Sequence, residues 1–330
     1  MSVENRMKNY NQNSSYQLHL AKLSTDLILQ AISRVLNTPS QTYVLADYGC
    51  SEGLNSSILF KEIIGHIENL TESNFLLFFN DLPFINWANF FKVISSQEAF
   101  ISKRVFSSAI GKSFGEQILP SNTLHFGFSS LAFHWLSEPV PKYTRLEFNH
   151  YNEENAQIGI RHYTRLLELR YQELVIGGQL IFITLTFLGE DAIYEFQKEL
   201  FNQLHKKGLI TEEEALNFKY PIYLLTSEQW DKVLETFAGR FKIHEKNIRI
   251  IPKISLISDE SQLKGMLETL SNAFFCMFKD CYESVFQNRE NKEEIIDIAK
   301  ENLKEIVAEK VMKQEFGEGN TICIALEKIS

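Results

Sequence analysis

A strand, a turn and a helix predicted at residues 43–59 constrain the fold of this 330-residue chain more than any other feature. The sequence there reads YVLADYGCSEGLNSSIL, in which an apolar run ends at Asp47 and a turn containing Gly49 and Gly53 precedes a second apolar pattern. Short apolar runs bounded by turn residues are typical of buried strands, and the second pattern is typical of a helix. In sheets of parallel strands, ligands bind at such turns beside the amino terminus of the helix. We therefore expect a ligand at this turn.

Strand-like and helix-like segments alternate through the first half of the chain, which predicts a mostly parallel sheet flanked by helices. A helical pattern over residues 153–174 is followed by Gly177 and Gly178, and glycine is common just after a helix ends. The predicted strands cover residues 43–47, 75–80, 105–109, 123–128 and 179–185.

After residue 186 the pattern changes to helices over 191–237, an extended segment, an amphipathic helix over 293–314 and a final strand from Thr321. This order predicts a sheet domain with a mostly helical cap. We expect residues 1–188 to form the ligand-binding α/β core with its N-terminal segment. The helical cap is expected at 189–240, with further cap helices within 255–315, and the strands that return to the core sheet at 241–254 and 320–330.

Charge and cysteine content exclude several classes of partner. The formal net charge is −9, with 42 acidic and 33 basic residues and no dense basic stripe, which argues against nucleic acid. No apolar run approaches membrane-spanning length, and the polar start of the chain lacks the features of a signal peptide, so we expect a cytoplasmic protein. No metal site is expected, because no cysteine pair or cysteine–histidine cluster has ligand spacing among Cys50, Cys276, Cys281 and Cys323.

The spacing of the glycines and a second acidic strand end indicate which ligand the turn binds. Gly49 and Gly53 match neither the dinucleotide fingerprint nor a Walker A loop, which weakens a nicotinamide or ATP interpretation. Asp81 follows the second predicted strand, where an acidic side chain commonly accepts hydrogen bonds from ribose hydroxyls. Either aspartate alone is more typical of a turn cap. The pair at successive strand ends favours a nucleoside without pyrophosphate, namely S-adenosylmethionine, whose ammonium group Asp47 would meet.

A third segment, SNTLHFGFSSLAFHWLSEP, places two ring N–H groups beyond the end of the fourth strand. A single histidine or tryptophan is usually part of a packed core. His134 and Trp135 are adjacent, however, and lie at the edge where open sheets bind ligands. Both rings can donate hydrogen bonds to one carboxylate. The segment therefore predicts a site for a small anion.

In five segments the chain resembles the SABATH methyltransferases, a family that includes salicylate, jasmonate and benzoate carboxyl methyltransferases and caffeine-pathway N-methyltransferases. The segments are NSSYQ at 13–17, ADYGCSEGLN at 46–55, FNDLP at 79–83, SFGEQILPSNTLHFGFSSLAFHWLS at 113–137 and LRYQELVIGGQL at 169–180. They occur in order over the first half to two thirds of the chain, and residues 208–223 resemble the family's cap helices. The resemblance implies a Rossmann-like class I methyltransferase sheet with a mostly helical cap, binding S-adenosyl-L-methionine and releasing S-adenosyl-L-homocysteine.

The resemblance also assigns roles to individual positions. The acceptor carboxylate would be positioned by Gln17 and Trp135, with His134 in the neighbouring motif position, while Lys8 has no clear counterpart. The donor site, to which Gly49 adds a close backbone approach, would comprise Tyr10, Ser14, Asp47, Gly49, Asn55, Asp81, Leu82, Ser113, Phe114 and Ser129.

The acceptor side departs from the plant family pattern. Leu131 stands where plant members have a tyrosine, and Ala132 where they have a hydroxyl group. A more apolar wall at Leu131 suits an aliphatic or aromatic acid without a second polar group near it.

The expected reaction is methyl transfer to a small carboxylic acid, giving a methyl ester. A carboxylic acid with a pKa of about 4 is already ionised at neutral pH, so no general base is needed. Three alternatives remain open: N-methylation of a small heterocycle, a non-catalytic protein that binds the donor, and, more distantly, a nicotinamide dehydrogenase. The presence of both Gln17 and Trp135 favours the carboxylate. Members of the family often form dimers, so a homodimer is a further expectation.

Overall fold

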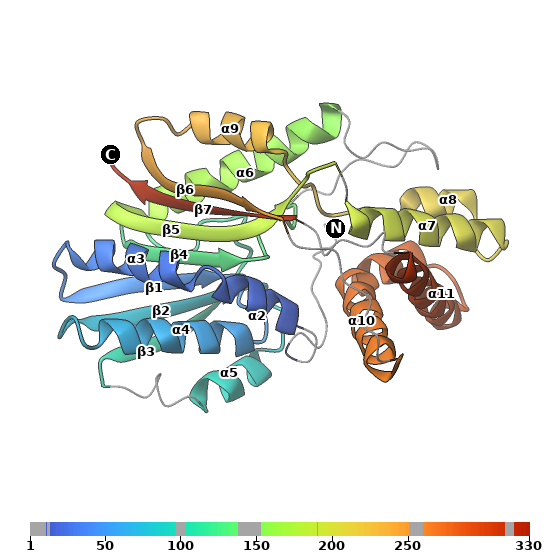
Figure 1. Cartoon of the computed structure of the whole chain (residues 1–330), viewed down its shortest axis with the longest axis horizontal. Coiled ribbons are helices and arrows are strands. Elements are labelled where there is room, and N and C mark those ends of the chain that lie inside the picture. The colour runs from blue at the N-terminus through green and yellow to red at the C-terminus, as the bar shows by residue number, and fades with distance from the viewer. Residues whose placement is uncertain are drawn as a thin grey trace.

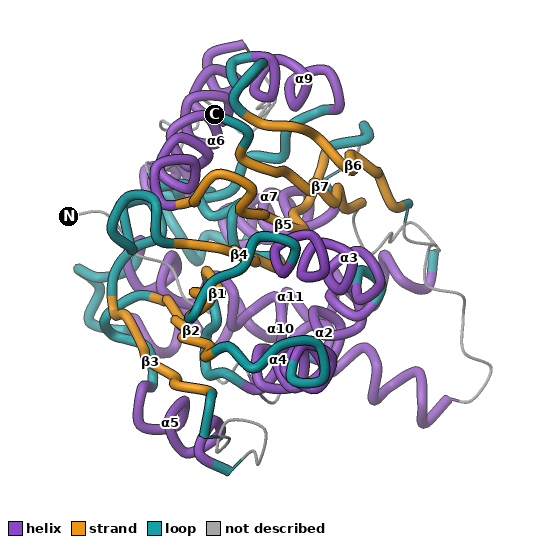
Figure 2. Tube along the Cα trace, turned by 90° about the vertical axis from the view of Figure 1, so that its left-hand side faces the viewer, coloured by secondary structure: helices purple, strands orange, loops and turns teal. Residues whose placement is uncertain are grey.

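The computed structural model describes residues 11, 14–96, 103–137, 153–189, 191–250, 260–313 and 320–330. A seven-stranded sheet in the order β3-β2-β1-β4-β5-β7-β6 forms the core of one part of the molecule, with helices packed around it (Figure 1). The first five strands pair in parallel, and β7 is antiparallel to both of its neighbours. Figure 2 shows β3 and β6 at opposite ends of the sheet. The strands are β1 (Thr42–Tyr48), β2 (Asn74–Asp81), β3 (Val105–Gly111), β4 (Leu124–Ser130), β5 (Leu174–Thr186), β6 (Phe241–Arg249) and β7 (Asn320–Lys328).

All five strands predicted in the first half are present, but β5 begins earlier than expected. Helix α6 (Glu153–Glu173) ends directly before Leu174, the first residue of β5, so Gly177 and Gly178 lie inside the strand. They occupy the stretch where the register of β5 against β4 shifts. The glycine pair therefore belongs to a β-bulge and does not follow the helix end directly, which corrects the prediction.

Helices cover both faces of the sheet. Helices α3 (Thr25–Leu36), α4 (Leu54–Ile67) and α5 (Trp87–Ser95) pack on one face, and α6 and α9 (Ser227–Glu235) pack on the other. In β1, Leu45 packs with the first set and Ala46 with the second, because successive side chains point to opposite faces. Burial on both faces explains why β1 is a continuous apolar run in the sequence.

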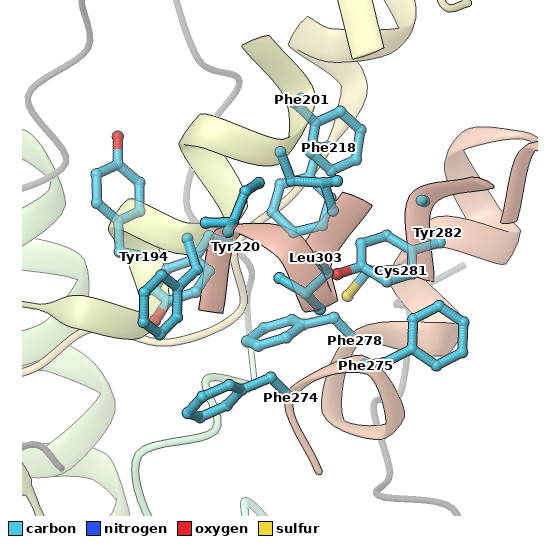
Figure 3. Packing of buried hydrophobic residues seen from close by; sticks show 14 of the residues in the cluster. Tyr194, Phe201, Phe218, Tyr220, Phe274, Phe275, Phe278, Cys281, Tyr282 and Leu303 are labelled. Atoms are coloured by element: carbon cyan, nitrogen blue, oxygen red, sulfur yellow. The ribbon is translucent and has the colours of Figure 1, made fainter. Parts of the chain in front are cut away.

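A helical cap lies beyond the carboxyl end of β5 (Figure 1). It contains α7 (Ala192–Lys206), α8 (Glu212–Asn217), α10 (Glu260–Val285) and α11 (Lys292–Met312), whose buried side chains form one cluster. Aromatic rings dominate the part of that cluster drawn in Figure 3. The ring centroids of Phe201 and Phe218 are 4.5 Å apart, and those of Tyr220 and Phe278 are 5.6 Å apart. Stacked and tilted ring pairs at these distances stabilise the cap beyond simple burial.

The structure distributes the later segments between cap and core. Although α9 falls inside the range 189–240 expected for the cap, its Trp230 is buried in the cluster that α6 forms with the sheet. The extended segment expected at 241–254 contains β6, and residues 251–254 lie outside the described ranges. Helix α2 (Ser15–Lys22) contacts α4 and β4, which brings the N-terminal segment to the carboxyl edge of the sheet.

Candidate functional site

The turn after β1 has a backbone shape that requires its two glycines. Gly49 has φ +86°, and a Cβ added there would lie 2.3 Å from the Cβ of Ala132. Gly53 has φ +84°, and its Cβ would lie 2.6 Å from the ring of Phe90. The Gly49 N–H also donates to the carbonyl of Asn80 at 2.8 Å, which fixes the turn against β2. The glycines therefore let the turn pack closely against the segment after β4 and against α5.

Two carboxylates lie at the ends of β1 and β2. Burial raises the pKa of Asp47 to about 7, although a hydrogen bond with Ser56 opposes this effect and the charge of Asp81 adds to it. Burial also raises the pKa of Asp81 to about 6, against hydrogen bonds from backbone N–H groups. Those bonds come from Leu82 at 2.8 Å and Ser51 at 2.6 Å. A cation bound beside them would favour the ionised form of both carboxylates.

A cleft that is partly open to solvent connects this turn with α2 and β4. Four of the residues predicted for the site line it, namely Gln17, Asp47, Gly49 and Asn55. Ser130 lines it too, and its buried hydroxyl has no hydrogen-bond partner among the described residues. The cleft therefore combines a carboxylate, an amide and an unsatisfied hydroxyl, as expected of a site that binds a polar ligand.

The N-terminal segment supports the cleft from one side. Asn55 donates to the carbonyl oxygen of Ser14 at 3.0 Å, and the Ser14 hydroxyl lies 3.4 Å from the Asn55 side-chain oxygen. Asn11 accepts a hydrogen bond from the Leu54 N–H at the start of α4. Ser14 is buried and contacts Asn55 without lining the cleft itself. Tyr10 and Lys8 lie outside the described residues.

The segment predicted to contact adenine follows β3. Lys112 donates its backbone N–H to the carbonyl of Asp81 at 2.8 Å, which places Ser113 and Phe114 near the second carboxylate. The Ser113 hydroxyl accepts a hydrogen bond from the Gly115 N–H. The Phe114 ring lies 5.5 Å from the ring of Phe133 in the segment after β4. The structure thus brings the predicted ribose and adenine positions to the same edge of the sheet.

The fourth strand places its two serines on opposite sides. The Ser129 hydroxyl is buried and donates to the carbonyl of Tyr48 at 2.8 Å, whereas Ser130 lines the cleft. The sequence predicted Ser129 as a donor-site residue but did not predict Ser130. The alternation of side chains along a strand is the signal that separates the two, once the register of β4 is known.

His134 and Trp135 lie between the sheet and the cap. Burial lowers the pKa of His134 to about 3, and the neighbouring His162 adds to this effect, so the imidazole is neutral. Trp135 is half-buried, and its ring lies 6.1 Å from the ring of Phe278 in α10. Neither residue lines the cleft that contains Gln17. The structure therefore places the residues predicted for the acceptor on two separate segments, α2 and the segment after β4.

Within the described residues, no group of three or more histidine, cysteine or acidic side chains is arranged to bind a metal ion. No helix in the described part of the chain combines the length and the apolar character needed to span a membrane.

Comparison with known proteins identifies the family of this chain. Residues 1–329 match the profile of the family described as SAM dependent carboxyl methyltransferase. The chain is 26% identical over 301 residues to paraxanthine methyltransferase 2 of Arabidopsis thaliana, with 81% of this chain and 83% of that protein covered. It is 26% identical over 262 residues to loganic acid O-methyltransferase of Catharanthus roseus, with 68% and 69% covered.

A further relative is the farnesoic acid carboxyl-O-methyltransferase of Arabidopsis thaliana, 28% identical over 257 residues, with 68% of this chain and 72% of that protein covered. Among solved structures, a loganic acid methyltransferase with SAH matches with a TM-score of 0.78 and 21% identity, over 97% of this chain and 96% of that one. That match confirms the Rossmann-like class I methyltransferase fold. The chain belongs to the SAM-dependent carboxyl methyltransferases, the SABATH family that its motifs predicted.

Proposed function

We propose that this enzyme transfers the methyl group of S-adenosylmethionine to a small, largely apolar carboxylic acid, and that the donor binds in the cleft beside Asp47. The observation that carries the assignment is the pair of carboxylates at adjacent strand ends, Asp47 buried and Asp81 half-buried, whose pKa values desolvation raises. They lie beside a turn that only glycine can form without strain. Family membership indicates the type of reaction, and these residues support the location proposed for the donor.

The residues in the cleft and the neighbouring Asp81 fit the donor chemically. Asp47 would meet the ammonium group, because a buried carboxylate is stabilised by a cation. Asp81 would accept from the ribose hydroxyls, since each of its oxygens has a second lone pair beyond the backbone bond that it already receives. Ser130, with its unsatisfied hydroxyl, is a further candidate contact. When bound, S-adenosylmethionine supplies a methyl group activated by the adjoining sulfonium.

The acceptor side needs orientation and no proton transfer. The acid is already a carboxylate at neutral pH, so the reaction requires no general base. His134, whose buried imidazole is neutral, is not needed for proton transfer. Gln17 and Trp135 would donate hydrogen bonds that aim one carboxylate oxygen at the methyl group. Correct alignment of two reacting groups can lower a barrier by about 7–11 kcal/mol. We propose these roles for Gln17 and Trp135 as the acceptor-positioning pair.

An apolar acid suits the walls of the acceptor side. Leu131 and Trp135 both pack against the aromatic cluster of the cap. Relatives carry names for acids as different as loganic, farnesoic and salicylic acid, so the relatives leave the acid of this enzyme open. Paraxanthine methyltransferase 2 is also among them, which makes a heterocyclic nitrogen the second candidate acceptor.

An acceptor screen tests the proposal. Purified protein is incubated with S-adenosylmethionine labelled in the methyl group and with a panel of aromatic, terpenoid and fatty acids plus xanthines. Base-labile methyl esters are the expected product. We expect Gln17→Ala and Trp135→Ala to lower turnover about tenfold or more while donor affinity changes little. Label found only in base-stable N-methyl products would instead establish the second candidate.

The proposal also covers the cellular compartment and the oligomeric state of the enzyme. We propose a cytoplasmic homodimer that acts without nucleic acid or membrane partners. The formal charge of −9 supports the absence of a nucleic-acid partner. None of the four cysteines, which all lie in the described ranges, is in a disulfide. Sedimentation velocity tests the dimer, and cell fractionation tests the compartment.

A further inference from the structure

Helix α6 has buried polar side chains that the proposed mechanism does not use. His162 is 7% exposed, and Arg170 and Glu173 are both 0% exposed. Buried polar groups destabilise a fold unless they are hydrogen-bonded, so their partners indicate why they are present. All three residues bond to segments outside the helix, and those segments are the ones that carry predicted site residues.

His162 connects the two ends of the segment 133–137. Its Nε2 lies 3.0 Å from the carbonyl oxygen of Phe133, and its Nδ1 lies 3.4 Å from the backbone nitrogen of Ser137. Burial lowers the pKa of His162 to about 4, so the ring is neutral, with one donor and one acceptor nitrogen. Nε2–H donates to Phe133, and Nδ1 accepts from Ser137. One imidazole thus spans the loop that carries His134 and Trp135.

Arg170 makes the equivalent contacts with the segment 113–119, where Ser113 and Phe114 lie. Its Nη1 donates to the carbonyl of Phe114 at 2.9 Å, and its Nη2 donates to the carbonyl of Glu116 at 2.8 Å. Glu173 pairs with the same guanidinium at 2.8 Å and accepts hydrogen bonds from the backbone N–H groups of Ile118 and Leu119. The buried ion pair therefore neutralises itself and satisfies four backbone groups of this segment.

The same ion pair reaches the end of β1. The Tyr48 hydroxyl donates to Glu173 Oε2 at 2.6 Å, and the Arg170 guanidinium lies 4.2 Å from the centre of the Tyr48 ring. Tyr48 follows Asp47 directly in the chain. Arg170 and Glu173 consequently join the end of β1 to the segment that follows β3, the two sides of the proposed donor site.

We propose that α6 positions the two halves of the active site separately: His162 positions the acceptor loop, residues 133–137, while Arg170 and Glu173 position the donor loop, residues 113–119. The inference rests on the proposed function, because that function identifies one loop with the acceptor and the other with the donor. His162 and Arg170 are eight residues apart on one helix, so both contacts come from a single rigid element. Changes at one residue should then alter one substrate's binding and leave the other's unchanged.

The test uses variants that remove each set of bonds with little change in volume. His162→Phe removes both ring hydrogen bonds, and His162→Gln keeps one donor. The double variant Arg170→Met with Glu173→Gln removes both charges together, so that no buried charge remains unpaired. Tyr163→Phe is the matched control, because Tyr163 is a buried neighbour on the same helix whose hydroxyl bonds only to Thr184 among the described residues, at 3.5 Å.

Two readouts separate the loops. In amide hydrogen exchange, His162→Phe should speed exchange in residues 135–137 about tenfold or more, and the double variant should do so in residues 115–119. In calorimetry, the double variant should weaken S-adenosylhomocysteine binding about tenfold, whereas His162→Phe should change it less than about twofold. His162→Phe should raise KM for the acid, and His162→Gln should recover part of the loss. Tyr163→Phe should change none of these constants.

The inference is wrong if both sets of variants speed exchange in both loops equally, in proportion to their loss of thermal stability. Exchange requires no substrate, so this outcome is separate from a failure of the proposed function, which would show as absence of S-adenosylhomocysteine binding to the wild-type protein. Should the wild type bind while the double variant binds equally well, Arg170 and Glu173 are structural residues only.

Discussion

The environments of Asp47 and Asp81 are the strongest indication of which ligand the protein binds. Both were predicted from their places at successive strand ends, and both lie at the carboxyl edge of the sheet beside the glycine turn. The raised pKa values could not be predicted, because they depend on burial and on the neighbours Ser56, Ser51 and Leu82. Ser130 escaped prediction for a related reason, since a one-residue difference in strand register reverses which serine faces the cleft.

The affinity for S-adenosylmethionine should rise with pH between about 6 and 8. In the ligand-free protein both carboxylates are mostly protonated below about pH 6 and attract the cationic donor weakly, and both are mostly ionised above about pH 8. Binding near pH 6.5 should therefore release protons. Calorimetry in buffers of different ionisation enthalpy measures this release. An affinity that stays flat from pH 6 to 8, with no proton release, contradicts the assignment of Asp47 and Asp81.

Asp47→Asn should stabilise the ligand-free protein at pH 8 while weakening donor binding. The pKa of Asp47 is raised from 3.8 to about 7, so its contribution to stability is greatest at low pH and is lost as the pH rises through that window. Removing the buried charge should raise the free energy of unfolding at pH 8 by about 1–3 kcal/mol. Denaturant unfolding checks this, and the difference should nearly vanish at pH 4. A less stable variant at pH 8 would show that the carboxylate is already well paired.

At the scale of elements, the hydrophobic pattern predicted the strands well, but their ends less well. The pattern cannot say whether Gly177 and Gly178 end a helix or form a bulge, because glycine suits both. The contacts of Arg170 with residues 114–116 were also out of reach, since they join segments more than 50 residues apart in the chain. The turn between β1 and α4 was predictable because its glycines and its strand signal are adjacent.

Gly49→Ala tests whether that turn carries the site. The new Cβ would sit at φ +86° and lie 2.3 Å from Ala132, so the segment after β4 must move. We expect a loss of about 2–4 kcal/mol in the free energy of unfolding and a loss of S-adenosylhomocysteine binding. Gly65→Ala in α4 is the control: nothing lies within 4 Å of its added Cβ, and a gain of about 0.5–1 kcal/mol is expected. If Gly49→Ala binds the ligand normally, the close approach is not required.

At the scale of the whole molecule, the cleft lies at the carboxyl edge of the sheet, between α2, the turn after β1 and the end of β4. The order of strands could not be read from the hydrophobic pattern, because every buried strand presents the same apolar signal. The family motifs implied a Rossmann-like class I methyltransferase sheet without a strand order, and the structure shows antiparallel β7 between β5 and β6. The division of later segments between cap and core depends on packing, as the burial of Trp230 of α9 with the sheet illustrates.

A crystal structure of the protein soaked with S-adenosylhomocysteine tests the central claim most directly. We expect the amino group of the ligand within hydrogen-bond distance of Asp47, its ribose hydroxyls on Asp81, and its sulfur facing the side of the cleft where Gln17 lies. A ligand bound elsewhere, or bound in the cleft without contact to either carboxylate, would contradict the claim.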